Sequence, residues 1–185
     1  MELVLDRAYR VVRFITDDII GKCAAFVMFA ATAMAIVEIF RRYILGVVFD
    51  WGQDAVTYFM VSAVFLYFIV VQAHRSNLAM LAAVDALKKR GFIKLVLTIR
   101  MLITALSLYL FTNFAIWGMP AVERAEMMGR KTQSMMLVIW PFQACLMIGF
   151  GLMAVVTLFQ LYQDIQAIRG KTVFPWAPVD EHIEI

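Results

Sequence analysis

Residues 23–37 read CAAFVMFAATAMAIV, a stretch in which no side chain is charged. Residues 58–71, YFMVSAVFLYFIVV, form a second uncharged stretch of similar length. An α-helix needs about 20 mainly apolar residues to cross the roughly 30 Å of hydrocarbon in a bilayer. We therefore expect membrane-spanning helices at residues 19–40 and 54–73, which extend these two stretches.

Two more apolar segments follow. The third begins near Phe92 and is expected to end at Met119 and Pro120. The fourth covers residues 135–162, and its Pro141 and glycines predict a kink or a close helix contact. Hydrophobic residues make up 63% of the chain and charged residues 17%, against about half and a quarter in soluble domains. The sequence predicts an all-α membrane protein with four transmembrane helices.

Two segments outside the spans have the pattern of helices that lie in the membrane interface. Residues 1–18 separate apolar from charged side chains onto two helical faces, and residues 78–90 form a short amphipathic segment before Gly91. We expect residues 1–162 to form one four-helix membrane domain and residues 163–185 a flexible cytoplasmic tail. The basic residues expected to contact the lipid interface are Arg10, Arg13, Lys88, Lys89, Arg90 and Arg100.

The distribution of basic residues predicts the orientation. Most of the 17 Lys and Arg residues fall in the N-terminal segment, the connection between the second and third spans, and the tail. Because positive residues are retained on the cytoplasmic side, both termini should be cytoplasmic. The basic residues flank spans and do not form one patch, so we expect contact with membrane lipids and no nucleic-acid partner.

Residues typical of catalytic or cofactor sites are sparse. Cys23 and Cys145 lie alone in apolar runs, and the two histidines, His74 and His182, do not make the pair that usually holds a membrane haem. No nucleophile, zinc or phosphate-binding motif stands out. We therefore expect neither an enzyme nor a cofactor or metal site.

Several polar residues remain in or beside the spans. Interhelical hydrogen bonding is the favoured interpretation, and a substrate path with Asn113 as its best candidate is the alternative. These residues are Tyr58, Ser62, Tyr67, Thr104, Ser107, Tyr109, Thr112, Asn113 and Gln143.

The segment from residue 40 to 87 resembles a known family. Arg42 and Tyr43 end the first span, and Trp51, Gln53 and Asp54 open the second. This order is similar to that in the small membrane subunit, or Q subunit (DctQ-like), of tripartite ATP-independent periplasmic (TRAP) transporters. The resemblance covers all four spans. Gln53, Asn77 and Leu81 stand where that family often has acidic residues or His.

The resemblance implies a role in a three-part secondary transporter of the bacterial inner membrane. A periplasmic substrate-binding protein captures an organic acid, and a large membrane subunit moves it by an elevator motion coupled to sodium. The small subunit would scaffold the large one and help to dock the binding protein, without binding the transported ion itself. A self-contained small carrier or channel and, less favoured, a membrane redox subunit remain the alternatives.

Two groups of residues are candidates for contacts with these partners. One group lies around the first outer connection. Its candidate subunit-interface residues are Glu38, Arg41, Arg42, Trp51, Gln53, Asp54 and Tyr58. Within this group we also expect Glu38 to pair with Arg41 or Arg42. The other is the mixed-charge connection after the third span, with a solvated loop as an equal alternative. Its candidate docking residues are Glu123, Arg124, Glu126, Arg130 and Lys131.

Overall fold

The computed structural model describes residues 2–75, 93–134, 136–169 and 173–174. These residues form helices joined by short connections, with one isolated β-bridge. The helices are α1 (Glu2–Phe14), the π-helical segment η1 (Ile15–Ile20), α2 (Gly21–Phe40), the π-helical segment η2 (Arg41–Leu45), α3 (Gly52–Ala73), α5 (Ile93–Met127) and α6 (Trp140–Ile168).

Four helical stretches are long and apolar enough to cross a membrane. They are Leu5–Leu45, Gly52–Ala73, Leu95–Met127 and Trp140–Ile168. The prediction of an all-α protein with four such helices is therefore confirmed by length and composition. The cytoplasmic placement of both termini stays a prediction.

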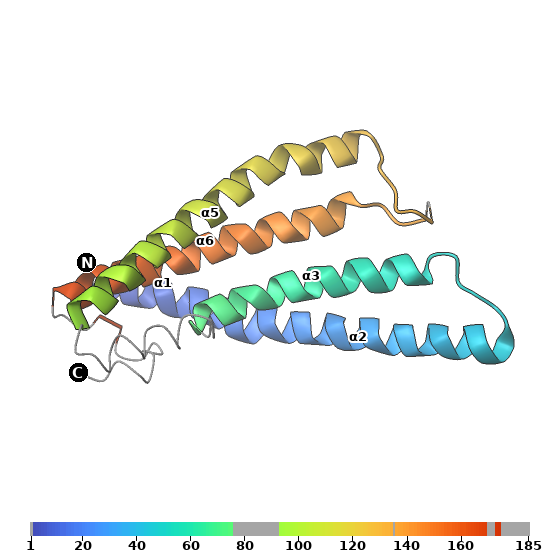
Figure 1. The fold of residues 1–185 in the computed structure, drawn as a ribbon, viewed down its shortest axis with the longest axis horizontal. Helices are drawn as coiled ribbons and strands as arrows, with labels where there is room; N and C mark the ends of the chain where they lie inside the picture. The colour runs from blue at the N-terminus through green and yellow to red at the C-terminus, as the bar shows by residue number, and fades with distance from the viewer. Residues whose placement is uncertain (1, 76–92, 135, 170–172, 175–185) are drawn as a thin grey trace.

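The long helices lie in a row in the order α2, α3, α6, α5 (Figure 1). Within the described ranges α3 contacts both α2 and α6, α6 contacts α5, and no extensive contact joins α2 to α5. Helices that are apolar all round can expose two broad faces in this way only where lipid or another apolar chain covers them. Many of the exposed side chains are large and apolar, which agrees with such an environment.

The N-terminal helix is continuous with the first span. The stretch Leu5–Leu45 has 41 residues, about 60 Å of helix, which is twice the thickness of the hydrocarbon. Tyr9 of α1 is buried between the rings of Phe159 and Phe174, with both centroid distances 5.0 Å. One face of α1 therefore packs on α6, and its location in the membrane interface stays a prediction. The second predicted interfacial helix, residues 78–90, lies outside the described residues.

Three predicted helix boundaries were wrong: the third helix continues past Pro120, and the fourth helix begins and ends later than the predicted range 135–162. Pro120 lies inside α5, which continues to Met127. A proline removes one helical hydrogen bond, but Val122 and Ala125 beyond it are buried, and their packing offsets that loss. The fourth helix begins only at Trp140, so Pro141 is in its first turn, where a missing N–H costs little. The predicted close contact is present at Gly149, where an added Cβ would lie 3.8 Å from the Phe65 carbonyl oxygen of α3.

Candidate functional site

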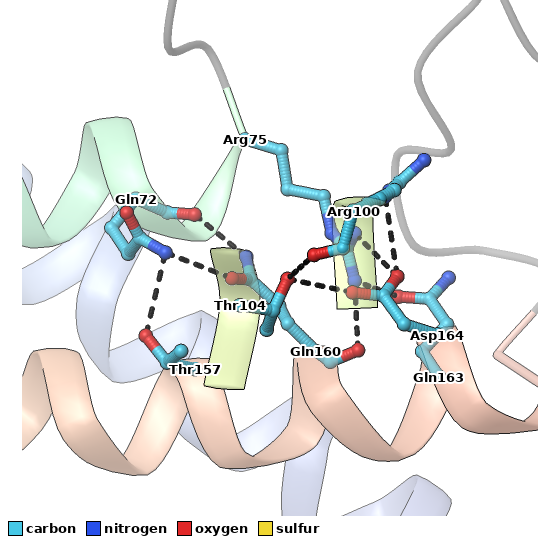
Figure 2. Close-up of polar contacts among 8 residues, drawn as sticks. All are labelled: Gln72, Arg75, Arg100, Thr104, Thr157, Gln160, Gln163 and Asp164. Carbon is cyan, nitrogen blue, oxygen red and sulfur yellow. Dashed lines mark hydrogen bonds and ion pairs between the residues drawn. The ribbon is translucent and has the colours of Figure 1, made fainter. Parts of the chain in front are cut away.

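A buried group of polar side chains joins α3, α5 and α6 near the end of α3 (Figure 2). We name it the Asp164 cluster after its acidic member. The cluster comprises Gln72, Arg75, Arg100, Thr104, Thr157, Gln160, Gln163 and Asp164. Thr157, Gln160 and Asp164 share one face of α6 because they are three and four residues apart.

Asp164 is the charged centre of the cluster. Its side chain is 5% exposed, and Oδ1 lies 2.7 Å from Arg75 Nη1 and 3.2 Å from Arg100 Nε. The hydroxyl of Thr104 donates to Oδ2 at 2.7 Å. A carboxylate in an apolar bundle is tolerated when cations and hydrogen bonds satisfy it. Asp164 meets both conditions, and its partners come from two other elements.

Two glutamines join α3 to α6 beside the charged centre. Gln72 Nε2 donates to Gln160 Oε1 at 3.0 Å, and Gln160 Nε2 donates to the Gln72 carbonyl at 2.6 Å. Gln72 Nε2 also lies 3.3 Å from Thr157 Oγ1. This reciprocal pairing fixes the register between α3 and α6 because neither glutamine can slide without losing both bonds.

Arg75 reaches the cluster through an unusual backbone conformation. Its φ of 52° is in the left-handed region, which is strained for a residue other than glycine. The guanidinium also donates from Nη2 to the Gln160 carbonyl at 3.0 Å and to Gln163 Oε1 at 3.3 Å. These bonds to α6 hold Arg75 in a conformation that the chain would otherwise avoid.

A smaller charged group fastens the N-terminal helix to the same end of α3. Arg13 is buried, donates to the Ala73 carbonyl and pairs with Asp17 at 3.0 Å. His74 Nε2 lies 3.4 Å from the other oxygen of Asp17. Arg13 therefore supports the last turn of α3, whose carbonyl groups lack helical partners.

The candidate lipid-interface residues that the structure describes differ in their exposure. Arg10 is exposed and pairs with Asp6 at 3.2 Å, whereas Arg13 and Arg100 have partners inside the protein. Lys88, Lys89 and Arg90 lie outside the described residues. Contact of these residues with lipid phosphates stays a prediction.

The α2–α3 connection and the helix ends beside it hold part of the candidate subunit interface. Within the described residues Glu38 pairs with neither Arg41 nor Arg42, so the predicted ion pair is wrong. The Arg41 guanidinium instead lies 3.7 Å from the centre of the Phe49 ring. The Glu38 carboxylate abuts Gly52, where an added Cβ would lie 2.7 Å from Oε2. This position favours a negative charge because α3 begins at Gly52.

The other interface candidates divide between the two sides of α3. Gln53 lines a cavity together with α2, and Trp51 packs on Phe49 with a centroid distance of 5.6 Å. Asp54 faces the α5–α6 connection, where its Oδ2 accepts a hydrogen bond from the Ser134 backbone N–H at 2.8 Å. Tyr58 faces α6, where its ring centre lies 5.3 Å from that of Phe142. The seven candidates therefore do not form one cluster.

The candidate docking residues are all exposed, on the last turns of α5 and in the connection to α6. This connection contains a β-bridge between Lys131 and Val138. The Thr132 N–H donates to the Leu137 carbonyl at 2.8 Å, and the hydrogen bond to Asp54 fixes the connection to α3. The candidate docking charges therefore lie on the last turns of α5 and on this bridged connection, which we call the α5–α6 hairpin.

Sequence reasoning missed most of the Asp164 cluster. Thr104 and Arg100 were noticed separately, but the fourth span was expected to end before Asp164. The polar spacing of Thr157, Gln160 and Asp164 was the available signal, since polar residues on one helical face predict a shared partner. Asn113, the candidate for a substrate path, donates to the Tyr109 carbonyl of its own helix at 2.8 Å.

Comparison with models of known protein families gives a match over most of the chain. The family model "Tripartite ATP-independent periplasmic transporters, DctQ component" matches residues 31–167. This range includes the α2–α3 connection, the α5–α6 connection and the whole Asp164 cluster. No curated protein and no solved structure matches the chain.

Proposed function

Because the chain belongs to the DctQ family, the small membrane components of TRAP transporters, we propose that it is a fixed scaffold for the large membrane subunit. In this role it stays in place while the large subunit carries an organic acid across the inner membrane, coupled to sodium. The family is a transporter component and not an enzyme family. Sodium and substrate bind to the large subunit in this proposal.

The observation that carries the proposal is the cross-linking of α3, α5 and α6 by the Asp164 cluster. The Asp164 carboxylate contacts Arg75, which follows α3, and Arg100 and Thr104 of α5. Gln72 and Gln160 add a hydrogen bond between α3 and α6. A subunit that changed its own shape during transport would have to separate these buried charges, which is costly in an apolar medium. The cluster therefore favours a rigid support over a moving carrier.

We propose further that the α5–α6 hairpin helps to dock the periplasmic binding protein. The 35 residues of α5 span about 52 Å, well beyond the roughly 30 Å of hydrocarbon. With both termini cytoplasmic, the excess would carry Glu123, Glu126, Arg130 and Lys131 into the periplasm. Charges at the rim of an interface act mainly on association rate.

Reconstitution tests the scaffold. The tagged chain is co-expressed with the large subunit of its transporter, and recovery of the complex and substrate uptake in proteoliposomes are measured. The proposal expects stable recovery, uptake that needs both membrane subunits and the binding protein, and no uptake by this chain alone. Uptake by the isolated chain would instead support a self-contained carrier.

Charge reversal tests the docking hairpin. R130E/K131E should slow uptake at limiting binding-protein concentration while leaving the membrane complex intact. R7E/R169E is the matched control, because it reverses two exposed basic residues at the opposite end of the helices. Equal uptake by both variants at low and high salt would refute docking at the hairpin.

A further inference from the structure

An aromatic cluster joins α1, α6 and the short segment Val173–Phe174 that follows α6. We name it the Tyr9 cluster; its rings are those of Tyr9, Phe159, Tyr162 and Phe174. The Phe174 ring centre lies 5.0 Å from that of Tyr9 and 6.3 Å from that of Tyr162, which are distances of rings in contact. Tyr9 and Phe174 are 2% and 3% exposed. The last described residues of the chain therefore pack against its first helix.

The Tyr9 cluster is one of two points that fasten α1. Tyr9 and Arg13 are the buried side chains among residues 5–14, and their spacing of four puts them on one helical face. Arg13 donates to the Ala73 carbonyl at the end of α3. Other side chains of α1 are open, including Val11 at 53% and Phe14 at 59% exposed. The hold on α1 is therefore narrow, and each of the two points matters to it.

The backbone of Phe174 shows that its ring has a specific seat. Its φ of 63° is in the left-handed region, which a bulky side chain rarely adopts. Such a conformation persists only where surrounding contacts hold it. The ring contacts of Phe174 are to Tyr9 of α1 and Tyr162 of α6, and Val173 packs against the same cluster. Both neighbouring helices thus contribute to holding the strained residue.

We infer that Val173 and Phe174 form a strap that locks α1 onto α6. Without the Phe174 ring, Tyr9 keeps its contact with Phe159 alone, and a face of the Tyr9 ring that is now buried is uncovered. The position of the N-terminal helix therefore depends on a segment from the other end of the sequence. Displacing the strap releases α1 while the Asp164 cluster stays in place. The contact is a switch between a locked and a released N-terminal helix, which the scaffold role does not require.

F174A in the full chain tests the strap, because it deletes the ring and keeps the rest of the segment. Amide hydrogen exchange of the purified subunit in mild detergent is measured for each helix. Exchange in α1 should accelerate about tenfold or more, with a smaller acceleration in the last turn of α3, which Arg13 supports. F174L keeps a large apolar side chain and should accelerate α1 less. F29A is the control, since it makes the same change at a position of α2 that is 74% exposed.

Two truncations locate the strap along the chain. Removal of residues 173–185 should accelerate exchange in α1 as F174A does, whereas removal of residues 175–185 should leave α1 as protected as in the wild type. Equal acceleration by both truncations would overturn the assignment to Val173 and Phe174.

The pattern of exchange along the chain separates the strap from a general loss of stability. Wild-type exchange of α1 in F174A would overturn the inference. Acceleration spread evenly over α1, α3, α5 and α6 would also overturn it, because Phe174 would then stabilise the whole fold and not one contact. These measurements use the isolated subunit, so their outcome leaves the scaffold proposal untouched.

Discussion

Replacing Asp164 with Asn removes the negative charge of the Asp164 cluster and preserves the shape of the side chain. The amide oxygen of D164N can still accept hydrogen bonds, but the NH2 group that replaces the second carboxylate oxygen can only donate. Arg75 and Arg100, whose side chains are 9% and 12% exposed, lose the carboxylate that they share. Their charges then have no acidic partner in the cluster, so we expect D164N to destabilise the contact of α6 with α3 and α5.

The size of this effect follows from the burial of the groups. Removing one member of a buried charge pair typically costs about 3–5 kcal/mol, whereas a neutral hydrogen bond between membrane helices averages about 0.6 kcal/mol. We expect about 3 kcal/mol for D164N, at the lower end, because Arg75 keeps its bonds to Gln160 and Gln163. For a chain of this size that corresponds to a thermal midpoint lower by about 6–12 °C.

The shift in thermal midpoint is measured by unfolding each variant in the same mild detergent and monitoring the loss of helix by far-UV circular dichroism. E123Q is the matched control, since it makes the same change from carboxylate to amide at an exposed position of α5. Its midpoint should stay near that of the wild type. Midpoints of D164N and E123Q within about 2 °C of each other would refute the reasoning, because a shift that small corresponds to at most about 1 kcal/mol.

Three further predictions concern other parts of the fold. G52A places a methyl group against the Glu38 carboxylate and should lower the thermal midpoint. G151A fills open space and should leave the midpoint unchanged or raise it slightly. D54A removes the hydrogen bond that fixes the α5–α6 hairpin, so amide hydrogen exchange in that hairpin should accelerate, while D50A should leave it unchanged. A cysteine at Glu126 should react with an impermeant reagent from the periplasm; labelling only from the cytoplasm would reverse the predicted topology.

The existence of four spans could be predicted because it depends only on local composition. Mainly apolar stretches such as residues 54–73 are long enough to cross a bilayer whatever they pack against. The order of the helices could not be predicted in the same way. Spans that are apolar on every side carry no signal for the face that meets a neighbour, so the row α2, α3, α6, α5 follows from contacts between distant residues.

The Asp164 cluster shows that the direction of a single side chain is equally hard to predict from the sequence. A long basic side chain such as Arg100 can reach outward to phosphates or inward to a carboxylate, and the sequence favoured the outward direction. The structure directs it inward, because α6 continues far enough to place Asp164 beside it. Glu38 is a converse case: its helical spacing predicts a pair with Arg42, but the carboxylate turns towards the start of α3.

The central claim is that this subunit stays rigid while its transporter works, and a distance across the row of helices tests it most directly. Spin labels at Phe29 of α2 and Leu106 of α5, both exposed, would report the separation of the two edge helices after Cys23 and Cys145 are replaced by serine. Four adjacent helices place these axes roughly 24–30 Å apart. In the complete transporter we predict the same distance distribution with and without substrate and sodium. A shift of about 5 Å, the size of a one-turn helix displacement, would contradict the scaffold.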